Sequence, residues 1–423
     1  MTQGAAGGTS PPLDTAFARA HFPVLAGPWA LFENAGGTLA AAQVLDRIRT
    51  YMDEYQVQPG AAYPASARAA EMIVESHRAM AAMINAQPEE VMIGPSTSMN
   101  VFLLAQALRP GLHEGDEIVV TNLDHEANVG AWRKLAADGV TVREWRFDQD
   151  SFALEPEGLA ALLNERTRLV CFGHCSNITG GFADVPALVR MIHDAGALAC
   201  VDGVAYAPHR AIDVKAWDVD FYLCSTYKLY GPHLALLYGK RAHFERAAPL
   251  NHFFLDDELP LKLNPGGPNH ELSAGLAGVT AYLDALHAHH EGESNLPLHG
   301  RLAALFERIA AHEEALVAPL LDYLAAKPGV RLIGNPSADR HARAPTVAFV
   351  VEGRDAGDIA RAVAAHQVAI GAGDFYAARC IETLGLADRG GVVRASMVHY
   401  NTADEVQRLI RALDEAIEAS TGS

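Results

Sequence analysis

The stretch Asp220-Phe-Tyr-Leu-Cys-Ser-Thr-Tyr-Lys-Leu-Tyr-Gly-Pro-His-Leu234 decides how the rest of this chain is interpreted. An apolar run, typical of a strand, leads into a short polar cluster, then to Lys228, and then to a Gly-Pro turn. Twenty-six residues before Lys228, a second apolar run at 197–201 ends in Asp202-Gly203. The sequence thus places an acid and a lysine directly after two expected strands.

A strand-end acid and a strand-end lysine are the pair that pyridoxal phosphate (PLP) chemistry needs. The lysine forms a Schiff base with the cofactor aldehyde, and the carboxylate keeps the pyridine nitrogen protonated. The protonated ring then accepts electrons when a bond to the substrate α-carbon breaks. Because lysines at strand ends are usually only solvated, the interpretation of Lys228 and Asp202 as catalytic depends on the wider context.

The bulk composition sets limits on fold and partners. The 423 residues allow two domains, and half of them are hydrophobic. A formal net charge of −18 argues against nucleic acid or an anionic membrane as partner. The first twelve residues lack the features of a signal peptide and are expected to form a flexible tail. Five cysteines, an odd number without CxxC spacing, favour a reduced, cytoplasmic setting without a metal site.

Strand and helix patterns alternate through the first two-thirds of the chain. This alternation, with apolar runs typical of strands buried on both faces, predicts an α/β fold with a mostly parallel sheet between layers of helices. The expected strands are 91–94, 117–121, 141–147, 168–172, 197–201, 221–224 and 234–238, and the expected helices are 68–85, 99–108, 126–137 and 185–195.

The pattern changes near residue 290. The histidine-rich segment 287–294 is predicted to be a solvated loop rather than a metal site. After it we expect a small α+β domain with strands at 330–333, 346–351 and 392–396 and helices at 302–326, 356–366 and 403–419. The predicted division is an N-terminal segment 1–30 that packs on the small domain, a large domain 31–290 and a small C-terminal domain 291–423.

Segments from Leu31-Phe-Glu-Asn-Ala-Gly-Gly37 to Val393-Arg-Ala-Ser-Met-Val-His-Tyr-Asn-Thr402 carry a resemblance to a known family. In motifs and order the chain resembles the class V aminotransferases of PLP fold type I, specifically their cysteine desulfurase-like branch. The resemblance implies a large PLP-binding domain with a seven-stranded, mostly parallel sheet and a small C-terminal α+β domain. It also implies a homodimer with a shared active site and an amino acid as substrate.

The same resemblance assigns the cofactor pocket. Ser96 and Thr97, in a turn that opens a helix, would hold the phosphate together with Ser225 and Tyr227. Tyr227 stands where the desulfurases usually have a histidine, and a phenol can also donate to phosphate. His125 would stack on the pyridine ring and relay protons, and it completes the catalytic set with Lys228 and Asp202. The remaining cofactor contacts are Asn177, near O3′, and His270, in a loop that reaches the partner's phosphate.

On the substrate side, Arg394 matches the arginine that grips the α-carboxylate, for which a guanidinium has the right two-pronged shape. The other residues assigned to the substrate by resemblance are Asn34, Ala35, Gly36, Asn177 and Tyr376.

Gly371-Ala-Gly-Asp-Phe-Tyr376 departs from the family pattern most strongly. SUF-type desulfurases carry a segment like R-T-G-H-H-C there, whose cysteine is the nucleophile. Here Tyr376 takes the cysteine position and Gly371 the arginine position. Cys380 follows one helical turn later and is not expected to be a nucleophile. A second departure is Ala205, which cannot hydrogen-bond O3′; Tyr206 or a water could do so instead.

These features favour a PLP-dependent lyase that acts on an amino acid without a persulfide cysteine. Cysteine desulfurase is the main alternative, followed by aminotransferase and epimerase, with Tyr376 as the second acid in the last case. A relative from another class, a non-catalytic PLP-binding scaffold, stays open. The sequence does not name the amino acid.

Overall fold

The seven apolar runs of the large domain form one sheet, in the order β2-β8-β7-β6-β5-β3-β4. The computed structural model describes residues 12–418. Strands β3 to β7 are paired in parallel, and β8 runs antiparallel to both its neighbours. The expected mostly parallel sheet is therefore confirmed. Its strands are β2 (Val91–Gly94), β3 (Glu117–Thr121), β4 (Thr141–Trp145), β5 (Thr167–Gly173), β6 (Leu198–Asp202), β7 (Phe221–Ser225) and β8 (Ala235–Gly239).

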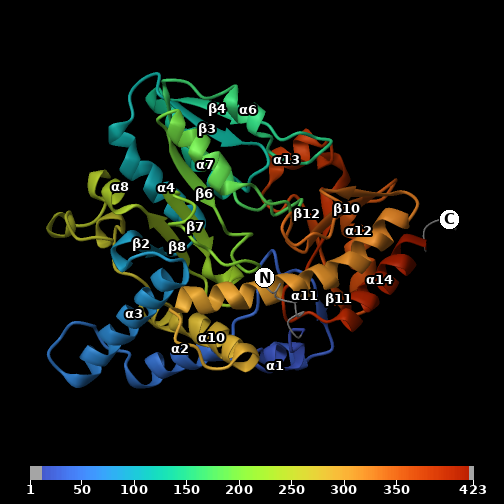
Figure 1. The fold of residues 1–423 in the computed structure, drawn as a ribbon, viewed down its shortest axis with the longest axis horizontal. Coiled ribbons are helices and arrows are strands. Elements are labelled where there is room, and N and C mark those ends of the chain that lie inside the picture. Colours follow the sequence, from blue (N-terminus) through green and yellow to red (C-terminus); the bar gives the residue numbers. More distant parts are fainter. Residues whose placement is uncertain (1–11, 419–423) are drawn as a thin grey trace, which may run out of the picture.

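Helices cover both faces of this sheet (Figure 1). One face packs on α4 (Thr97–Leu108) and α5 (Gly130–Lys134). The other packs on α3 (Pro64–Met83), α7 (Val185–Asp194) and α10 (Ala277–Glu291). Because neighbouring strand residues point to opposite faces, burial on both sides explains why these strands are continuous apolar runs.

The small domain is built on a four-stranded antiparallel sheet in the order β12-β13-β10-β9. Its strands are β9 (Val330–Ile333), β10 (Thr346–Val351), β12 (Gly371–Gly373) and β13 (Val392–Ser396). The helices α12 (Ala356–Ala364) and α14 (Ala403–Glu418) pack against it, and α13 (Ala378–Thr383) follows β12. The expected end of the last helix, residue 419, lies outside the described residues.

One long helix, α11 (Leu298–Ala326), joins the two domains (Figure 1). Its first half, with Leu302 and Ile309, belongs to the core of the large domain. Its second half, with Leu316 and Leu320, belongs to the core of the small domain. The boundary between the two hydrophobic cores thus falls inside α11, beyond the expected division at residue 290.

The N-terminal segment touches both domains. The short strand β1 (Ala30–Leu31) pairs in parallel with β11 (Val368–Ala369) of the small domain, and Arg19 forms an ion pair with Glu405 at 2.9 Å. Phe22, however, packs in the core of the large domain. The contacts of this segment are therefore shared, and residues 1–11, including the expected tail, lie outside the described residues.

Two local predictions were wrong. The helix expected at 126–137 is broken into η4 (Glu126–Asn128), α5 and η5 (Leu135–Asp138). Val129 leaves helical geometry with a φ of −121°, and the Asn128 side-chain amide beside it donates to Asp124 at 2.8 Å. The loop expected at 287–294 is helical as far as Glu291, where α10 ends before Gly292. There His287 is buried, and His289 and His290 bind Asp14. No helix within residues 12–418 is long and apolar enough to cross a membrane.

Candidate active site

A pocket lies where the large sheet ends on the side that faces the small domain. Strands β2, β3, β5, β6 and β7 all run toward this edge, so the residues that follow them converge, as ligand-binding residues do in open α/β sheets. The pocket is lined by Ser96, Thr97, Ser98, Asp124, His125, Ala127, Gly173, Cys175, Ser176, Asn177, Asp202, Val204, Ala205, Ser225, Tyr227 and Lys228. Eight of the residues that the sequence predicts to bind the cofactor are in this set.

Lys228 ends a short helical turn, η6 (Thr226–Lys228), directly after β7. Its side chain is buried, and burial, with a further effect of the Arg394 charge, lowers its pKa to about 8, while Asp202 opposes the shift. A lysine in this state is partly neutral near pH 7, and a neutral amine is the form that attacks an aldehyde.

Asp202 is the last residue of β6 and is buried in the pocket. Its Oδ1 accepts a hydrogen bond from the Val204 amide at 2.8 Å, and within residues 12–418 it has no ion-pair partner. Burial raises its pKa. A buried carboxylate without a cation in direct contact is costly, so the site fits a group that brings a cationic N–H, as the pyridinium of PLP does.

The first turn of α4 forms the opposite end of the pocket. Ser96 caps this helix by accepting a hydrogen bond from the Met99 amide at 3.2 Å. The Thr97 and Ser225 hydroxyls lie 2.7 Å apart, so β7 and α4 meet here. Hydroxyls and free amides at the start of a twelve-residue helix form a cradle for an anion. The donor set at both ends of the pocket therefore suits PLP.

His125 follows β3 and lies between the Lys228 and Arg394 charges. Its Nδ1 accepts a hydrogen bond from the Ala127 amide at 3.0 Å, so the neutral ring carries its proton on Nε2. Burial, then the charges of Lys228 and Arg394, lower its pKa to about 4. The imidazole is therefore a neutral N–H donor at physiological pH.

Asp124 is a pocket residue that sequence reasoning missed. Its carboxyl accepts hydrogen bonds from the Gly173 amide at 3.0 Å and from Asn128 at 2.8 Å. Burial raises its pKa to about 7, and the nearby Asp202 charge adds to the effect. Its position between a strand and His125 was the available signal, the same one that singled out Asp202.

Arg394 lies on β13, beside the pocket, and is only 2% exposed. Its Nη1 donates to the Asn177 carbonyl at 3.0 Å. Burial lowers its pKa to about 10. Among the described residues it forms no ion pair, and its buried Nε has no hydrogen-bond partner. An arginine of this kind needs an anion.

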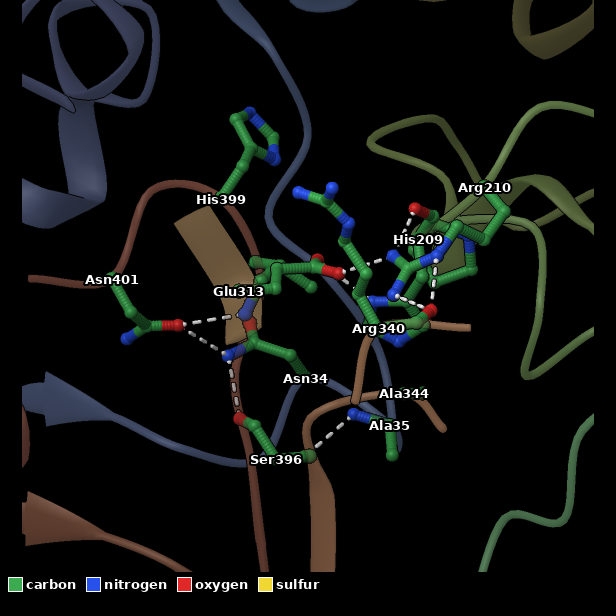
Figure 2. Close-up of polar contacts among 12 residues, drawn as sticks. Asn34, Ala35, His209, Arg210, Glu313, Arg340, Ala344, Ser396, His399 and Asn401 are labelled. Carbon is green, nitrogen blue, oxygen red and sulfur yellow. Dashed lines mark hydrogen bonds and ion pairs between the residues drawn. The ribbon is translucent and has the colours of Figure 1, made fainter. Parts of the chain in front are cut away.

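Asn34 and Ala35 are held at the junction of the two domains (Figure 2). The Asn34 amide donates to Ser396 O at 2.9 Å and to Asn401 Oδ1 at 3.2 Å, and its oxygen accepts from Tyr400. The Ala35 amide donates to the Ser396 hydroxyl. The Asn34 side chain is therefore held by protein atoms, and the substrate contact expected for it stays a prediction. A Cβ on Gly36 would lie 3.6 Å from Arg394 Nη2, so that residue does adjoin the arginine.

The remaining expected residues lie at the rim or away from the pocket. Tyr376 stacks on His125, with ring centroids 5.3 Å apart, and is 73% exposed. His270 begins α9 (His270–Gly275), which packs on α2 (Ala42–Glu54) and α3. Tyr206 stacks on His174 at 3.5 Å and does not line the pocket, so it cannot replace the side chain missing at Ala205. Within residues 12–418, no group of three or more potential ligands could hold a metal.

All five cysteines of the chain are buried. Cys380 lies on α13, as the helical pattern suggested, but it is 0% exposed in an apolar cluster, and burial raises its pKa to about 12. Cys175 lines the pocket, yet burial likewise raises its pKa to about 12, and its thiol lies 3.4 Å from the Gly180 carbonyl. Neither thiol has the exposed, low-pKa setting of a nucleophile.

Comparisons with known proteins give one consistent result. A model of the family described as aminotransferase class-V matches residues 30–409. The chain is 40% identical to the aminotransferase-like protein FGM3 of Gibberella zeae, covering 94% of this chain and 96% of that protein. It is 35% identical to the cysteine desulfurase-like protein ustD of Aspergillus flavus, covering 97% and 92%. The crystal structure of the cysteine desulfurase CsdA from Escherichia coli superposes with a TM-score of 0.81 at 27% identity, covering 96% and 99%.

Proposed function

This chain belongs to the class V aminotransferase family of PLP-dependent enzymes, and from that premise we propose that it is a lyase. It removes a substituent from the side chain of an amino acid and needs no persulfide cysteine. The observation that carries the proposal is the combination of a complete lysine–acid pair in the pocket with five cysteines that are all buried.

When bound, PLP supplies an aldehyde for the amino group and a cationic ring that accepts electrons. Lys228 would be the amine that holds this aldehyde, and Asp202 would hold the ring N–H. Ser96, Thr97, Ser225 and Tyr227 would hold the phosphate. The neutral ring of His125 would cover the cofactor and donate from Nε2.

Arg394 binds the substrate α-carboxylate and thereby fixes which bonds of the α-carbon face the lysine. With PLP bound, Lys228 Nζ would serve as the base that takes the α-proton. Its lowered pKa suits this task, because an amine with a pKa of about 8 exists partly as the free base near neutral pH. The bond to the β-substituent breaks next, and the leaving group departs with the electron pair.

The proposal is tested with 3-chloro-L-alanine and L-cysteine as probes, each given to the PLP-loaded protein. A lyase should release chloride or sulfide together with equal amounts of pyruvate and ammonia. Cys380→Ser should leave these yields unchanged, whereas Lys228→Ala should abolish them. A protein that takes up no PLP and releases no product would instead be the non-catalytic scaffold.

Cysteine desulfurase is the second candidate, favoured by the likeness to CsdA. A desulfurase would convert L-cysteine to alanine rather than pyruvate and would carry sulfur as a persulfide on one of its cysteines. Loss of alanine formation in Cys380→Ser would establish the desulfurase hypothesis and overturn the lyase hypothesis. Transamination would appear as pyruvate formed from L-alanine only when a 2-oxo acid is present.

We also propose that the enzyme is a homodimer in which His270 reaches the partner's phosphate site. The segment before it exposes Phe253 and Phe254, and adjacent exposed aromatic side chains indicate a contact surface. Mixing Lys228→Ala with His270→Ala protein should restore part of the activity, because one site in each mixed dimer would be intact. A monomer in sedimentation analysis would contradict the dimer.

A further inference from the structure

The turn formed by residues 374–376 lies beside the pocket, where Tyr376 stacks on the pocket residue His125. Phe375 and Tyr376 have φ values of +51° and +60°, a region that costs a side chain other than glycine about 1 kcal/mol or more. Two hydrogen bonds hold the turn in place: Asn177 Nδ2 donates to the Phe375 carbonyl at 3.0 Å, and the Glu126 amide donates to the Tyr376 carbonyl at 2.7 Å. Both partners belong to loops that line or adjoin the site.

The Phe375 ring packs against Arg394, the arginine proposed to bind the substrate α-carboxylate. The centre of its ring is 3.6 Å from Arg394 Cζ, the distance of a close cation–π contact. Arg394 Nη1 is already bound to the Asn177 carbonyl. One face and one end of the guanidinium are therefore covered by protein, and the edge with Nε and Nη2 is the part without a hydrogen-bond partner among the described residues.

The glycines on either side of this contact explain why it fits. A Cβ on Gly371 would lie 2.2 Å from Glu33 Oε1 and 2.8 Å from the Phe375 ring, so any larger residue there would displace the Glu33 carboxylate and the ring together. A Cβ on Gly36 would stand 3.6 Å from Nη2 and 3.2 Å from the Glu33 carbonyl. The glycine at 371 makes room for the clamping ring, and the glycine at 36 keeps a side chain away from Nη2.

We propose that Phe375 is a positioning residue that clamps Arg394, so that the Nε–Nη2 edge is presented to the α-carboxylate and the site selects substrates with a free acid group. This role rests on the proposed function, because it assumes that Arg394 receives the carboxylate. The clamp acts in two ways. It removes the rotational freedom that Arg394 would otherwise lose on binding, and it keeps water off the ion pair, which strengthens the attraction.

The test compares two probes on the PLP-loaded protein: L-alanine, which has no leaving group, and L-alaninamide, whose neutral amide replaces the acid. Their dissociation constants are read from the change in cofactor absorbance. The unmodified protein should prefer the acid. Phe375→Ala should weaken L-alanine binding about tenfold and leave L-alaninamide within about twofold, because only the acid uses the clamped edge.

Two further variants separate the clamp from a general loss of structure. Phe375→Leu keeps an apolar cover without the aromatic face and should fall between the unmodified protein and Phe375→Ala. Gly371→Ala retains the ring but displaces it together with the Glu33 carboxylate, and it should weaken L-alanine binding more than L-alaninamide binding. With a true substrate, each change should raise KM more than it lowers kcat.

Equal or tighter binding of L-alanine to Phe375→Ala would mean that the ring obstructs Arg394, and the clamp would be overturned. If Arg394→Ala loses the preference for the acid but Phe375→Ala keeps it, the clamp alone fails and the carboxylate site stands. An unmodified protein that ignores both probes, or prefers the amide, would remove the carboxylate site and the clamp together. Failure of Lys228 to bind PLP would instead refute the proposed function.

Discussion

Three buried charges define the chemistry at the scale of single residues. Lys228 lies buried in the pocket and Arg394 lies buried beside it, and Asp202 is a carboxylate without an ion-pair partner among the described residues. Each would be costly in an empty protein interior. The PLP aldehyde would satisfy Lys228, the pyridinium would satisfy Asp202, and a substrate carboxylate would satisfy Arg394. The arrangement therefore makes physical sense as the site of a PLP enzyme with an amino acid substrate.

The lowered pKa of Lys228 gives a pH dependence for cofactor uptake. The neutral amine attacks the aldehyde, so uptake of PLP by the cofactor-free protein should speed up about tenfold per pH unit below the pKa of about 8 and level off above it. The rate is followed by the appearance of visible absorbance after mixing. A rate that keeps rising to pH 10 would show that the lysine has its ordinary pKa.

Residues that act alone were easier to predict than residues that act through a partner. Lys228 and Asp202 were singled out because their local motifs mark strand ends, and Arg394 because its segment matches a family motif. Phe375 was not singled out as a functional residue, because its partner Arg394 is brought close only by the pairing of β12 with β13. The partners of Asn34 were not predicted for a similar reason: its amide binds Ser396 and Asn401, far along the chain.

At the scale of elements, the large sheet depends on a buried anchor at the end away from the pocket. Asp220, at the start of β7, accepts hydrogen bonds from His243 and His193, each at 2.8 Å, and from the Ala199 amide. It therefore ties β7 to β6, α7 and α8 (Arg241–Arg246). Burial would raise its pKa, but these hydrogen bonds outweigh burial and lower it.

Asp220→Asn should destabilise the protein by about 3 kcal/mol at pH 7, because it leaves buried donors without a charged acceptor. The matched control is Asp218→Asn, which alters a carboxylate that is 67% exposed and pairs with the same Lys240; it should change stability by about 0.5 kcal/mol or less. Urea denaturation measures both.

The pH dependence of stability offers a second check on this anchor. Because the folded pKa of Asp220 is lowered, its contribution is present above the unfolded value of about 4 and is lost as the pH falls through the folded pKa. The stability difference between the unmodified protein and Asp220→Asn should therefore shrink in acid. A difference that stays constant from pH 7 to pH 3 would contradict this.

Elements with strong apolar patterns were predicted to within a few residues, and β9, β10 and β13 match their expected bounds. The errors occur where side chains find distant partners. Segment 287–291 is polar enough to look like a loop, but its histidines are held by Asp14 and by the core, so it completes α10. Helix α2 has too few apolar residues to have been recognised, and its burial comes from packing on α9 and α10.

At the scale of the whole molecule, α11 holds the two domains in one arrangement. Near its middle, Glu313 is 1% exposed and binds His209 and Arg210 of the large domain, each at 2.8 Å (Figure 2). Arg210 also donates to the Arg340 carbonyl at 2.7 Å. This cluster lies where the two hydrophobic cores meet, so it fixes the small domain, and with it Arg394, relative to Lys228.

Glu313→Gln should lower the free energy of unfolding by about 3 kcal/mol, because it leaves the buried Arg210 charge without its counterion. The adjacent Glu314, whose side chain is 39% exposed, supplies the control: Glu314→Gln should shift stability by about 0.5 kcal/mol or less. Both are compared by urea denaturation at pH 7. Equal effects of the two substitutions would show that the cluster does not hold the domains together.

The central claim is that Lys228 carries PLP, and one measurement tests it most directly. The protein is loaded with PLP, reduced with borohydride to make the lysine–cofactor bond permanent, and digested, and the labelled peptide is identified by mass spectrometry. We expect a single pyridoxyl group on Lys228. A label on another lysine, or no label at all from protein that is folded and was incubated with PLP, would contradict it.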